Sequence, residues 1–404
     1  MDILYVTPTL PVPTSGGRTR VFNLIRKLAK SHRVSVISYV QPEEQEMISE
    51  IIPYCNQLEL VPFEGFKALS KWQNRLTGWY RILFRRRPRY AETFPLPKME
   101  APLQRLIREN RFDVAVFESL LVAELSTTIQ DIPAVLVEQN VESSVAKRLY
   151  TNADNIVHKL RDWLTWRKLL RYEVKWLRRF SVCVTVSEDD AEKVQSLAPK
   201  TDVYVVPNGV DIQHFTMNES ERDSNTLLFF GTLNYGPNLD GLLWFCDEIW
   251  PRIQLTNPHI KLDIVGLNPT PEVISLEKLK GVHVTGFVPD IRTKLWSATI
   301  GVVPLRIGGG TRLKILESLA TGCPVISTTI GAEGLSLVDG EHLLIRDTHD
   351  QFAQGVADLL DSVSLRKRLS KAGRLVVEQK YDWKHIGKLM EDACIQAIAF
   401  QNRM

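Results

Sequence analysis

The sequence is poor in cysteine, and the few cysteines that it has are scattered. Five occur in 404 residues, none of them in a Cys-x-x-Cys arrangement. Neither a zinc-binding cluster nor a framework of disulfide bonds is therefore expected. A reducing compartment is the simplest interpretation of such cysteine usage.

A strong excess of one charge and long apolar runs are lacking as well. Lys and Arg total 50 and Asp and Glu 47, a formal net charge of +3, which does not favour a nucleic-acid partner. No stretch approaches the roughly 18 apolar residues that cross a bilayer. The opening Met-Asp-Ile-Leu-Tyr-Val lacks the basic start of a signal peptide. We therefore expect a cytoplasmic protein, at most peripheral on the inner face of the cell membrane.

Two familiar nucleotide-binding signatures are missing too. The first strand-like run is not followed by Gly-x-Gly-x-x-Gly at the required spacing, which argues against a Rossmann dehydrogenase. The glycine-rich segment near residue 308 lacks the spacing of a P-loop. No internal repeat with a period of about 20–50 residues is present, so a solenoid is excluded.

Short runs rich in Val, Ile and Leu alternate with helical patterns along the chain. In the first helical pattern, Val21, Leu24, Ile25 and Leu28 share one face. Near-continuous apolar strands that alternate with helices indicate parallel sheets covered on both faces. The strand-like runs are 3–6, 34–38, 114–117, 134–137, 182–186 and 203–206, and then 227–230, 261–265, 282–285, 300–303 and 324–327.

A polar segment at 216–225 is typical of a linker and separates the two series of runs. The sequence therefore predicts an α/β protein of two domains, residues 1–210 and residues 211–383. Ligands of such sheets bind beyond the carboxyl ends of the strands. The motifs below all follow predicted strands.

The most distinctive motif is Arg306-Ile-Gly-Gly-Gly-Thr-Arg-Leu-Lys-Ile-Leu-Glu317, which precedes a helix predicted at 313–319. The glycines and the start of the helix form a cradle for an anion. Arg312 and Lys314 lie in the first turn, where positive charge opposes the helix dipole unless an anion binds there. The alternative is a surface helix with solvated cations.

Three other strand ends carry candidate residues. Gly16 and Gly17 let backbone N–H groups approach a ligand, unless their loop is only a flexible turn. Pro-Asn-Gly at 207–209 is a strong turn signal that is compatible with shaping a cleft. Glu138 is a candidate for acid/base chemistry if its pKa is tuned, whereas the interpretation as a helix cap or a solvated acid is favoured for Glu142.

Four motifs together resemble those of family 4 glycosyltransferases. They are Val-Pro-Asn-Gly-Val-Asp at 206–211, Val-Ser-Glu at 186–188, Gly-Phe-Val at 286–288, and Glu-Ser-Leu-Ala-Thr-Gly-Cys-Pro-Val-Ile at 317–326. The resemblance implies the GT-B architecture, in which two Rossmann-like domains face each other across a cleft. It also implies that a C-terminal helix, about 384–404, packs back on the first domain.

The same resemblance implies the activity. A sugar is transferred with retention of configuration from a nucleotide-diphosphate-sugar to a glycan or lipid-linked acceptor, without a cofactor or an essential metal. The implied pathway is surface polysaccharide or glycolipid biosynthesis. The predicted donor-binding residues are Gly16, Gly17, Asn208, Gly231, Gly286, Val288, Gly309, Gly310, Thr311 and Glu317.

The sequence departs from the family pattern at three places. The first of the family's two glutamates would fall at Gly309, whereas the second matches Glu317 and typically contacts the ribose. The loop 231–238 lacks the family's usual Arg and Lys, so we expect Arg312 and Lys314 to hold and stabilise the leaving diphosphate. Where a histidine often lies, Gln139 is the nearest match, and Glu138 remains as a candidate catalytic group.

Two alternatives stay open. One is a nucleotide-sugar epimerase of the same architecture. The other is a catalytically silent subunit that binds a nucleotide sugar, which Gly309 and Gln139 favour because both replace expected polar groups.

Two basic segments with interleaved tryptophans predict contact with anionic lipid headgroups on the acceptor side. The segment 67–89 has eight basic residues and no acidic one, and the segment 159–179 carries cations along one helical face. A solvated helix face with ordinary core tryptophans is the alternative. The cations named for this surface are Arg85, Arg86, Arg87, Lys168 and Lys175.

Overall fold

The computed structural model divides the chain into two compact units. The first comprises Met1–Pro207 and Ile386–Met404, and the second Asn208–His385. The boundary expected after residue 210 lies close to this division. The structure describes residues 1–14, 16–63, 87–129, 131–151, 155–217, 222, 225–308 and 311–401.

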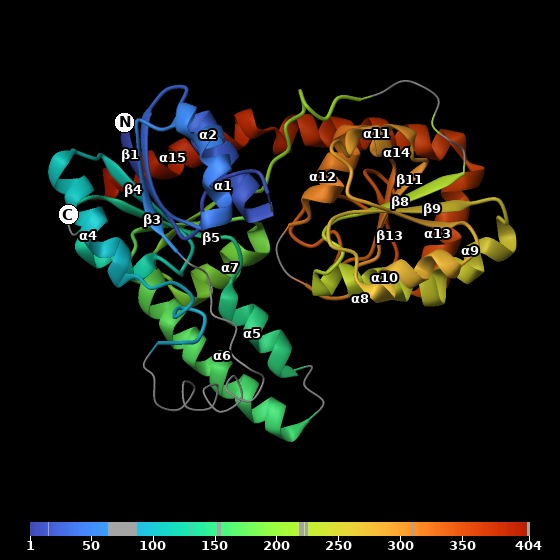
Figure 1. The fold of residues 1–404 in the computed structure, drawn as a ribbon, viewed down its shortest axis with the longest axis horizontal. Helices are drawn as coiled ribbons and strands as arrows, with labels where there is room; N and C mark the ends of the chain where they lie inside the picture. The colour runs from blue at the N-terminus through green and yellow to red at the C-terminus, as the bar shows by residue number, and fades with distance from the viewer. Residues whose placement is uncertain are drawn as a thin grey trace. The chain divides into compact units, whose positions relative to one another are not determined.

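The first unit is built on a parallel sheet of seven strands in the order β3-β2-β1-β4-β5-β6-β7 (Figure 1). All residues of the central strand β4 are buried, which requires cover on both faces of the sheet. The strand order reverses between β1 and β4. The strands are β1 (Asp2–Thr7), β2 (Arg33–Val40), β3 (Gln57–Pro62), β4 (Val114–Glu118), β5 (Ala134–Glu138), β6 (Val182–Thr185) and β7 (Asp202–Val205).

The first helix of this unit buries the predicted apolar face. Helix α1 (Gly16–Leu28) buries Val21, Leu24, Ile25 and Leu28. The other described helices are α2 (Ile48–Ile51), α4 (Pro97–Glu109), α5 (Glu142–Thr151), α6 (Ile156–Leu177) and α7 (Glu188–Leu197), with the 3-10 segments η1 (Pro42–Met47), η2 (Ile52–Tyr54) and η3 (Ala123–Thr128).

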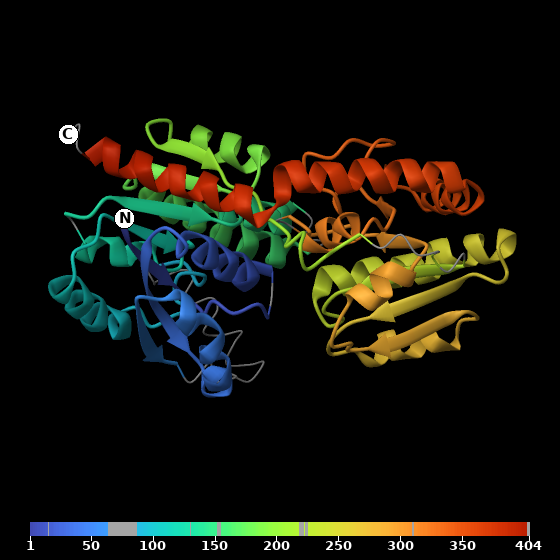
Figure 2. The same cartoon turned by 90° about the horizontal axis from the view of Figure 1, so that it is seen from above.

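The long helix α15 (Trp383–Gln401) begins in the second unit and belongs to the first from Ile386 onward. Figure 2 shows it lying along the first unit. Nε2 of His32 lies 3.0 Å from Oε1 of Glu391, and a Cβ on Gly387 would lie 2.8 Å from the Cβ of Lys27. The first turns of the helix that belong to the first unit therefore pack closely on the end of α1 and the turn that follows it.

The second unit repeats the same topology with six parallel strands in the order β10-β9-β8-β11-β12-β13. Here the order reverses between β8 and β11. The strands are β8 (Thr226–Phe230), β9 (Lys261–Val265), β10 (Val282–Gly286), β11 (Ile300–Val303), β12 (Val325–Ser327) and β13 (Leu344–Ile345).

The described helices of this unit include two short π-helical segments, η4 (Phe245–Ile249) and η6 (Val377–Tyr381). The others are α8 (Gly236–Trp244), α9 (Trp250–Thr256), α10 (Pro271–Ser275), the 3-10 segment η5 (Leu276–Lys278), α11 (Arg292–Ser297), α12 (Leu313–Ala320), α13 (His349–Asp361) and α14 (Val363–Val376). No helix within the described ranges is long and apolar enough to cross a bilayer.

The predicted fold class is confirmed, because both sheets are parallel and both have the Rossmann strand order. Every predicted strand-like run overlaps a strand and extends at most one residue beyond it. The sequence did not reveal β3 or β13. Strand β3 is an edge strand whose residues are mostly half-buried, and β13 has only two residues, so neither has a continuous apolar run.

The carboxyl ends of β8 and β9 come together at two glycines. The N–H of Gly231 donates to the carbonyl of Val265 at 3.0 Å, and the N–H of Gly266 donates to the carbonyl of Gly286 at 2.8 Å. A Cβ on Gly266 would overlap the carbonyl oxygen of Gly231. The backbone of the loop after β8 is therefore fixed by a contact that only glycine allows at position 266.

We predict that Gly266→Ala destabilises the second unit by roughly 1–3 kcal/mol, since its Cβ overlaps backbone that cannot move aside cheaply. Gly236→Ala is the matched control, because a Cβ there meets no atom within 4 Å. Urea unfolding measures both. Equal midpoints for Gly266→Ala and the wild-type protein would contradict the close approach.

Candidate functional site

In the second unit, two loops leave the sheet where the strand order reverses, one after β8 and one after β11. Helix α8 approaches the second loop so closely that a Cβ on Gly241 would lie 2.5 Å from the carbonyl oxygen of Pro304. Arg306 forms two hydrogen bonds with Asp240, of 2.6 and 3.1 Å, and lies over the ring of Trp244. These contacts fix the start of the glycine-rich loop against α8.

Lys314 reaches from the first turn of α12 to the loop after β8. Its Nζ donates to Oδ1 of Asn238 at 2.9 Å and lies 4.8 Å from the centroid of the buried Phe229 ring. A Cβ on Gly231 would lie 2.9 Å from this Nζ, and Gly231 has a φ of 146°, a conformation that favours glycine. A cation from α12 thus lies beside the loop in which the family's usual Arg and Lys are missing.

The charge of Lys314 is poorly compensated in this position. Desolvation, reinforced by the neighbouring positive charge of Arg312, lowers the pKa of Lys314 to about 7, and Glu317 only partly opposes this. Desolvation likewise raises the pKa of Glu317 to about 7, with Lys314 opposing. An anion bound beside Lys314 would favour its charged form.

Arg312 lies at the N-cap of α12, where the glycine-rich loop ends. Its guanidinium lies against the backbone of Gly308, since a Cβ on Gly308 would be 2.6 Å from Nη2 of Arg312. The predicted residues Gly309 and Gly310 lie outside the described part of the chain. Arg312 and Lys314 are therefore two cations that directly follow this loop, and the guanidinium of Arg312 also reaches its other described end at Gly308.

Other predicted donor-binding residues of this unit lie on neighbouring loops. Nδ2 of Asn208 donates to Oγ1 of Thr311, so the Pro-Asn-Gly turn holds the glycine-rich loop. Gly286 ends β10 with a φ of 73° and open space at its Cβ position, and Val288 packs on a small apolar cluster. Between them, the ring of Phe287 is 63% exposed.

Two residues of this region were missed from the sequence, Asn238 and Phe287. Both lie inside segments that the sequence pattern singles out, the loop 231–238 and the motif 286–288. The signal for Asn238 was a polar side chain in a loop that lacked the expected cations. The signal for Phe287 was an aromatic side chain at a strand end, where burial would otherwise be expected.

The predicted residues Gly16 and Gly17 belong to the first unit. A Cβ on Gly17 would lie 2.6 Å from Oε1 of Gln139, whose Nε2 donates to Oε1 of Glu118 at 2.9 Å. Arg18 forms an ion pair with Glu44. The predicted donor-binding set is thus divided, with Gly16 and Gly17 in one unit and the remaining members in the other.

Glu138 is the last residue of β5, and its side chain is only 2% exposed. Burial raises the pKa of Glu138 well above its ordinary value, and the charges of Glu173, Glu142 and Glu118 add to this effect. Burial also raises the pKa of Glu142 to about 7, and the hydroxyl of Tyr90 donates to its Oε1 at 3.1 Å. Glu142 therefore lies half-buried at the start of α5 and is not fully solvated.

The residues named for a membrane surface have different surroundings. Lys168 is half-buried, and Lys175 is exposed with its Nζ 4.5 Å from the centroid of the Trp176 ring. Arg87 pairs with Glu124 at 2.6 Å. Arg85 and Arg86 fall outside the residues that the structure describes.

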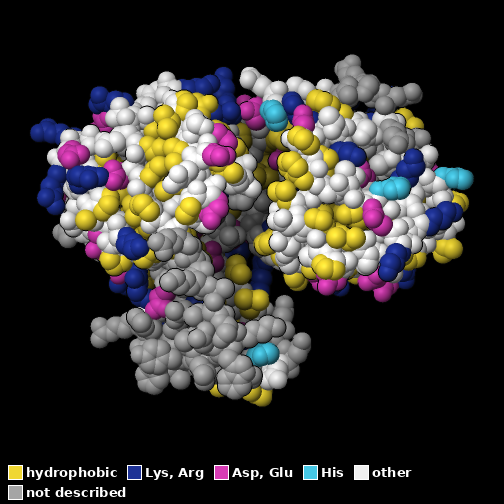
Figure 3. All heavy atoms as spheres, in the orientation of Figure 1, with side chains coloured by type: hydrophobic (Ala, Val, Ile, Leu, Met, Phe, Trp, Pro, Cys, Tyr) yellow, Lys and Arg dark blue, Asp and Glu magenta, His cyan; other side chains and the backbone are white. Residues whose placement is uncertain are grey.

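Helices α5 and α6 form a hairpin that extends away from the sheet of the first unit (Figure 1). Its outer part exposes several large apolar side chains, some of which are visible as yellow atoms in Figure 3. Their exposed fractions are 64% for Leu149, 79% for Ile156, 52% for Val157, 52% for Leu160 and 40% for Trp163. Trp163 is therefore not the core residue that the alternative interpretation required.

Comparison with known proteins identifies the family. A model described as Glycosyltransferase Family 4 matches residues 14–214, and a model described as Glycosyl transferases group 1 matches residues 224–362. Two parallel sheets of Rossmann order and the motifs at their strand ends are what this class of protein requires. The chain belongs to the family 4, or group 1, glycosyltransferases.

Three individual proteins illustrate the similarity. An uncharacterized 44.6 kDa protein in the cps region of Klebsiella pneumoniae is 23% identical over 72% of this chain and 76% of its own length. A phosphatidyl-myo-inositol mannosyltransferase of Mycobacterium tuberculosis is 28% identical over 48% of this chain, and the match spans about half (54%) of its length. The structure of Anabaena HepE with UDP and glucose has a TM-score of 0.68 at 14% identity and covers 98% of this chain and 100% of HepE.

We predict that Lys314→Met raises the melting temperature of the second unit at pH 6.5, since it removes a desolvated charge while keeping the length of the side chain. A gain of about 1 kcal/mol corresponds to about 2–4 °C. The folded-state pKa of about 7 is below the ordinary value of 10.5, so the destabilisation is complete below pH 7 and diminishes as the pH rises toward 10.5.

Thermal unfolding between pH 6.5 and 9.5 measures this difference. Lys278→Met, which replaces an exposed lysine of η5, is the control and should follow the wild-type curve. A Lys314→Met protein that melts below the wild-type protein at pH 6.5 would show that Lys314 has a structural role instead.

Proposed function

We propose that this protein transfers a sugar, with retention of anomeric configuration, from a nucleotide-diphosphate-sugar to a glycan or lipid-linked acceptor in surface polysaccharide or glycolipid assembly. The observation that carries the proposal is the position of Lys314. Its ammonium lies beside Gly231 and Asn238 at the carboxyl end of β8, where nucleotides bind in sheets of this order.

Arg312 and Lys314 supply the electrostatic part of the mechanism. Both follow the glycine-rich loop, whose backbone N–H groups and helix start favour an anion. Two fixed cations stabilise the negative charge that develops on the departing diphosphate, so neither a metal ion nor another cofactor is required. In front-face transfer the departing phosphate takes the proton of the acceptor hydroxyl.

The other residues of the site position the donor. Glu317 lies one turn further along α12, where a carboxylate accepts hydrogen bonds from the ribose hydroxyls. Gly286 leaves open space at the end of β10, and the exposed ring of Phe287 next to it offers a surface for the base. Asn208 holds Thr311 and with it the described end of the loop.

Relatives support this assignment. HepE was captured with UDP and glucose, a nucleotide and a sugar. The relative from Mycobacterium tuberculosis is named for transfer of mannose to phosphatidyl-myo-inositol, a lipid. A nucleotide-sugar donor and a lipid-linked acceptor are therefore proposed for this chain as well.

We predict that one nucleotide class in a panel of UDP-, GDP-, ADP-, dTDP- and CMP-sugars raises the melting temperature, since a ligand that binds only the folded state stabilises it. Arg312→Gln and Lys314→Met should each weaken binding about tenfold or more, because each removes a charge-assisted contact to phosphate. Lys278→Met serves as the control, and EDTA should leave the shift unchanged.

If both variants keep the full wild-type shift, the cation pair does not hold the diphosphate. Release of free nucleotide on addition of an acceptor separates a transferase from a silent subunit. Interconversion of donor sugars without such release indicates an epimerase.

The acceptor side of the proposal is a membrane surface contacted by the outer part of the α5–α6 hairpin. Exposed apolar side chains beside basic ones are typical of a surface that binds anionic lipid. The charged side chains of residues 156–171 are Lys159, Arg161, Asp162, Arg167, Lys168 and Arg171. Each cation near such a surface contributes about 1 kcal/mol.

We predict that the protein floats with vesicles of phosphatidylcholine and about 30% phosphatidylglycerol, and less so as salt rises. Replacing Leu160 and Trp163 together with Gln should abolish flotation, since it removes the apolar contact. Leu255→Gln, at an 84% exposed leucine of α9, is the control. Flotation that is unaffected by the double substitution would contradict the role of the hairpin.

A further inference from the structure

Four carboxylic acids gather in the first unit around the carboxyl ends of β5 and β6. Glu138 ends β5, Glu142 begins α5, Glu173 lies on α6 and Asp190 lies in the first turn of α7. Burial is the main cause that raises the pKa of Glu138, and the charges of the other three acids add to it. We refer to these four residues as the carboxyl cluster.

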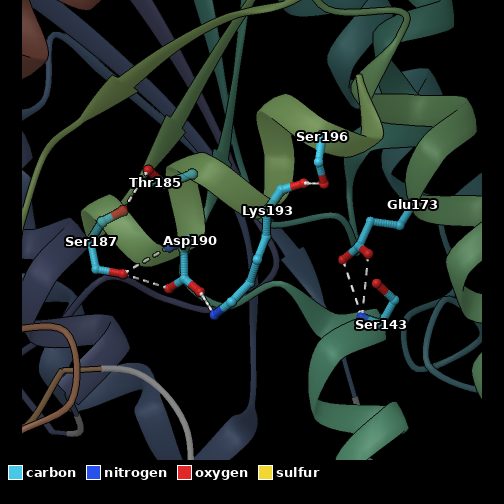
Figure 4. Close-up of polar contacts among 7 residues, drawn as sticks. All are labelled: Ser143, Glu173, Thr185, Ser187, Asp190, Lys193 and Ser196. Atoms are coloured by element: carbon cyan, nitrogen blue, oxygen red, sulfur yellow. Dashed lines mark hydrogen bonds and ion pairs between the residues drawn. The ribbon is translucent and has the colours of Figure 1, made fainter. Parts of the chain in front are cut away.

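Two members of the carboxyl cluster have evident structural partners (Figure 4). Both oxygens of Glu173 accept from the N–H of Ser143 at 3.3 Å, which caps the start of α5. Asp190 accepts from the hydroxyl of Ser187 at 3.0 Å and pairs with Lys193 at 2.9 Å. The hydrogen bonds that they form at the starts of α5 and α7 therefore account for these two acids.

Glu138 has no such explanation. Its side chain is 2% exposed, and among the described residues its Oε1 has no hydrogen-bond partner. An unpaired buried carboxyl oxygen costs free energy unless a ligand or water completes it. No three His, Cys, Asp or Glu side chains within the described ranges are arranged to hold a metal ion.

The residues beside Glu142 also indicate a ligand site near the carboxyl cluster. Tyr90 donates to Glu142, and its hydroxyl lies 3.2 Å from Oγ of Ser119, the residue that follows β4. Ser119 has a φ of 97°, which is uncommon for a residue with a side chain. Backbone strain of this kind gathers at ligand sites, and here it lies beside the point where the strand order reverses.

Glu138 and Glu142 provide complementary hydrogen-bonding groups. A carboxyl that keeps its proton both donates and accepts, whereas an ionised carboxylate only accepts. Burial raises the pKa of Glu138 well above its ordinary value and so favours its protonated form, while the pKa of Glu142 of about 7 leaves it partly ionised. Neighbouring hydroxyl groups of a sugar ring, which donate and accept in turn, match this pair.

We propose that Glu138 and Glu142 bind neighbouring hydroxyl groups of the sugar acceptor, with Tyr90 as the residue that positions Glu142. This acceptor subsite rests on the proposed transferase function and assigns its acceptor chemistry to the first unit. Tyr90 acts through Glu142 and does not itself contact the acceptor.

Saturation-transfer NMR with the full chain tests the subsite. The probes are the methyl α-glycosides of mannose, glucose and galactose. At least one should bind the wild-type protein. Glu142→Gln should weaken its binding about tenfold or more, because the charge-assisted bond is lost. Tyr90→Phe should weaken it less.

Glu138 is tested by a pair of substitutions. Glu138→Gln should keep binding, because an amide also donates and accepts, whereas Glu138→Leu should lose it. Glu50→Gln, at an exposed acid of the same unit, is the control. Melting curves establish whether each variant is folded. If Glu138→Leu does not fold, the test rests on Glu142→Gln, which replaces a half-buried side chain.

Two results would overturn the subsite. One is wild-type affinity in Glu142→Gln and, where it folds, in Glu138→Leu. The other is the absence of saturation transfer to all three glycosides with the wild-type protein. The nucleotide-sugar thermal shift is measured in parallel, and it should be unchanged in Glu142→Gln. If the wild-type protein gives no glycoside signal but keeps its nucleotide shift, the subsite alone is rejected. If the wild-type protein gives no nucleotide shift either, the proposed function is rejected.

Discussion

The side chain of Lys314 is the charge on which the candidate donor site depends. Its ammonium is desolvated between the ring of Phe229 and the amide of Asn238, and it fits there only because Gly231 has no Cβ. Such a position lowers the pKa of a lysine and costs stability. A chain retains a costly charge where a ligand compensates for it, and a diphosphate provides that compensation.

The same strand order serves two kinds of chemistry in this chain. In the second unit, the reversal of strand order lies beside two cations and a glycine-rich loop, which suit an anionic donor. In the first unit, it lies beside buried carboxyls and a tyrosine, which suit hydroxyl groups. Parallel sheets of this order direct their strand ends to one edge, and the loops there determine what binds.

The sequence predicted the strands well, because buried parallel strands such as β4 are continuous apolar runs. It also singled out Arg312, Lys314 and Glu317, because charge next to three glycines is a local pattern. It could not show that Lys314 reaches Asn238, which lies 76 residues away in the chain. The role of Tyr90 beside Glu142 and the strain at Ser119 were hidden for the same reason, since burial and backbone conformation depend on tertiary contacts.

The most direct measurement is the number of protons taken up when the stabilising nucleotide sugar binds at pH 8, from calorimetry in buffers of different ionisation enthalpy. Lys314 has a pKa of about 7 in the free protein, so binding beside a diphosphate should restore its charge and take up about 0.9 proton. The Lys314→Met protein should take up almost none. Binding without proton uptake, or with equal uptake in the variant, would contradict contact between Lys314 and the diphosphate.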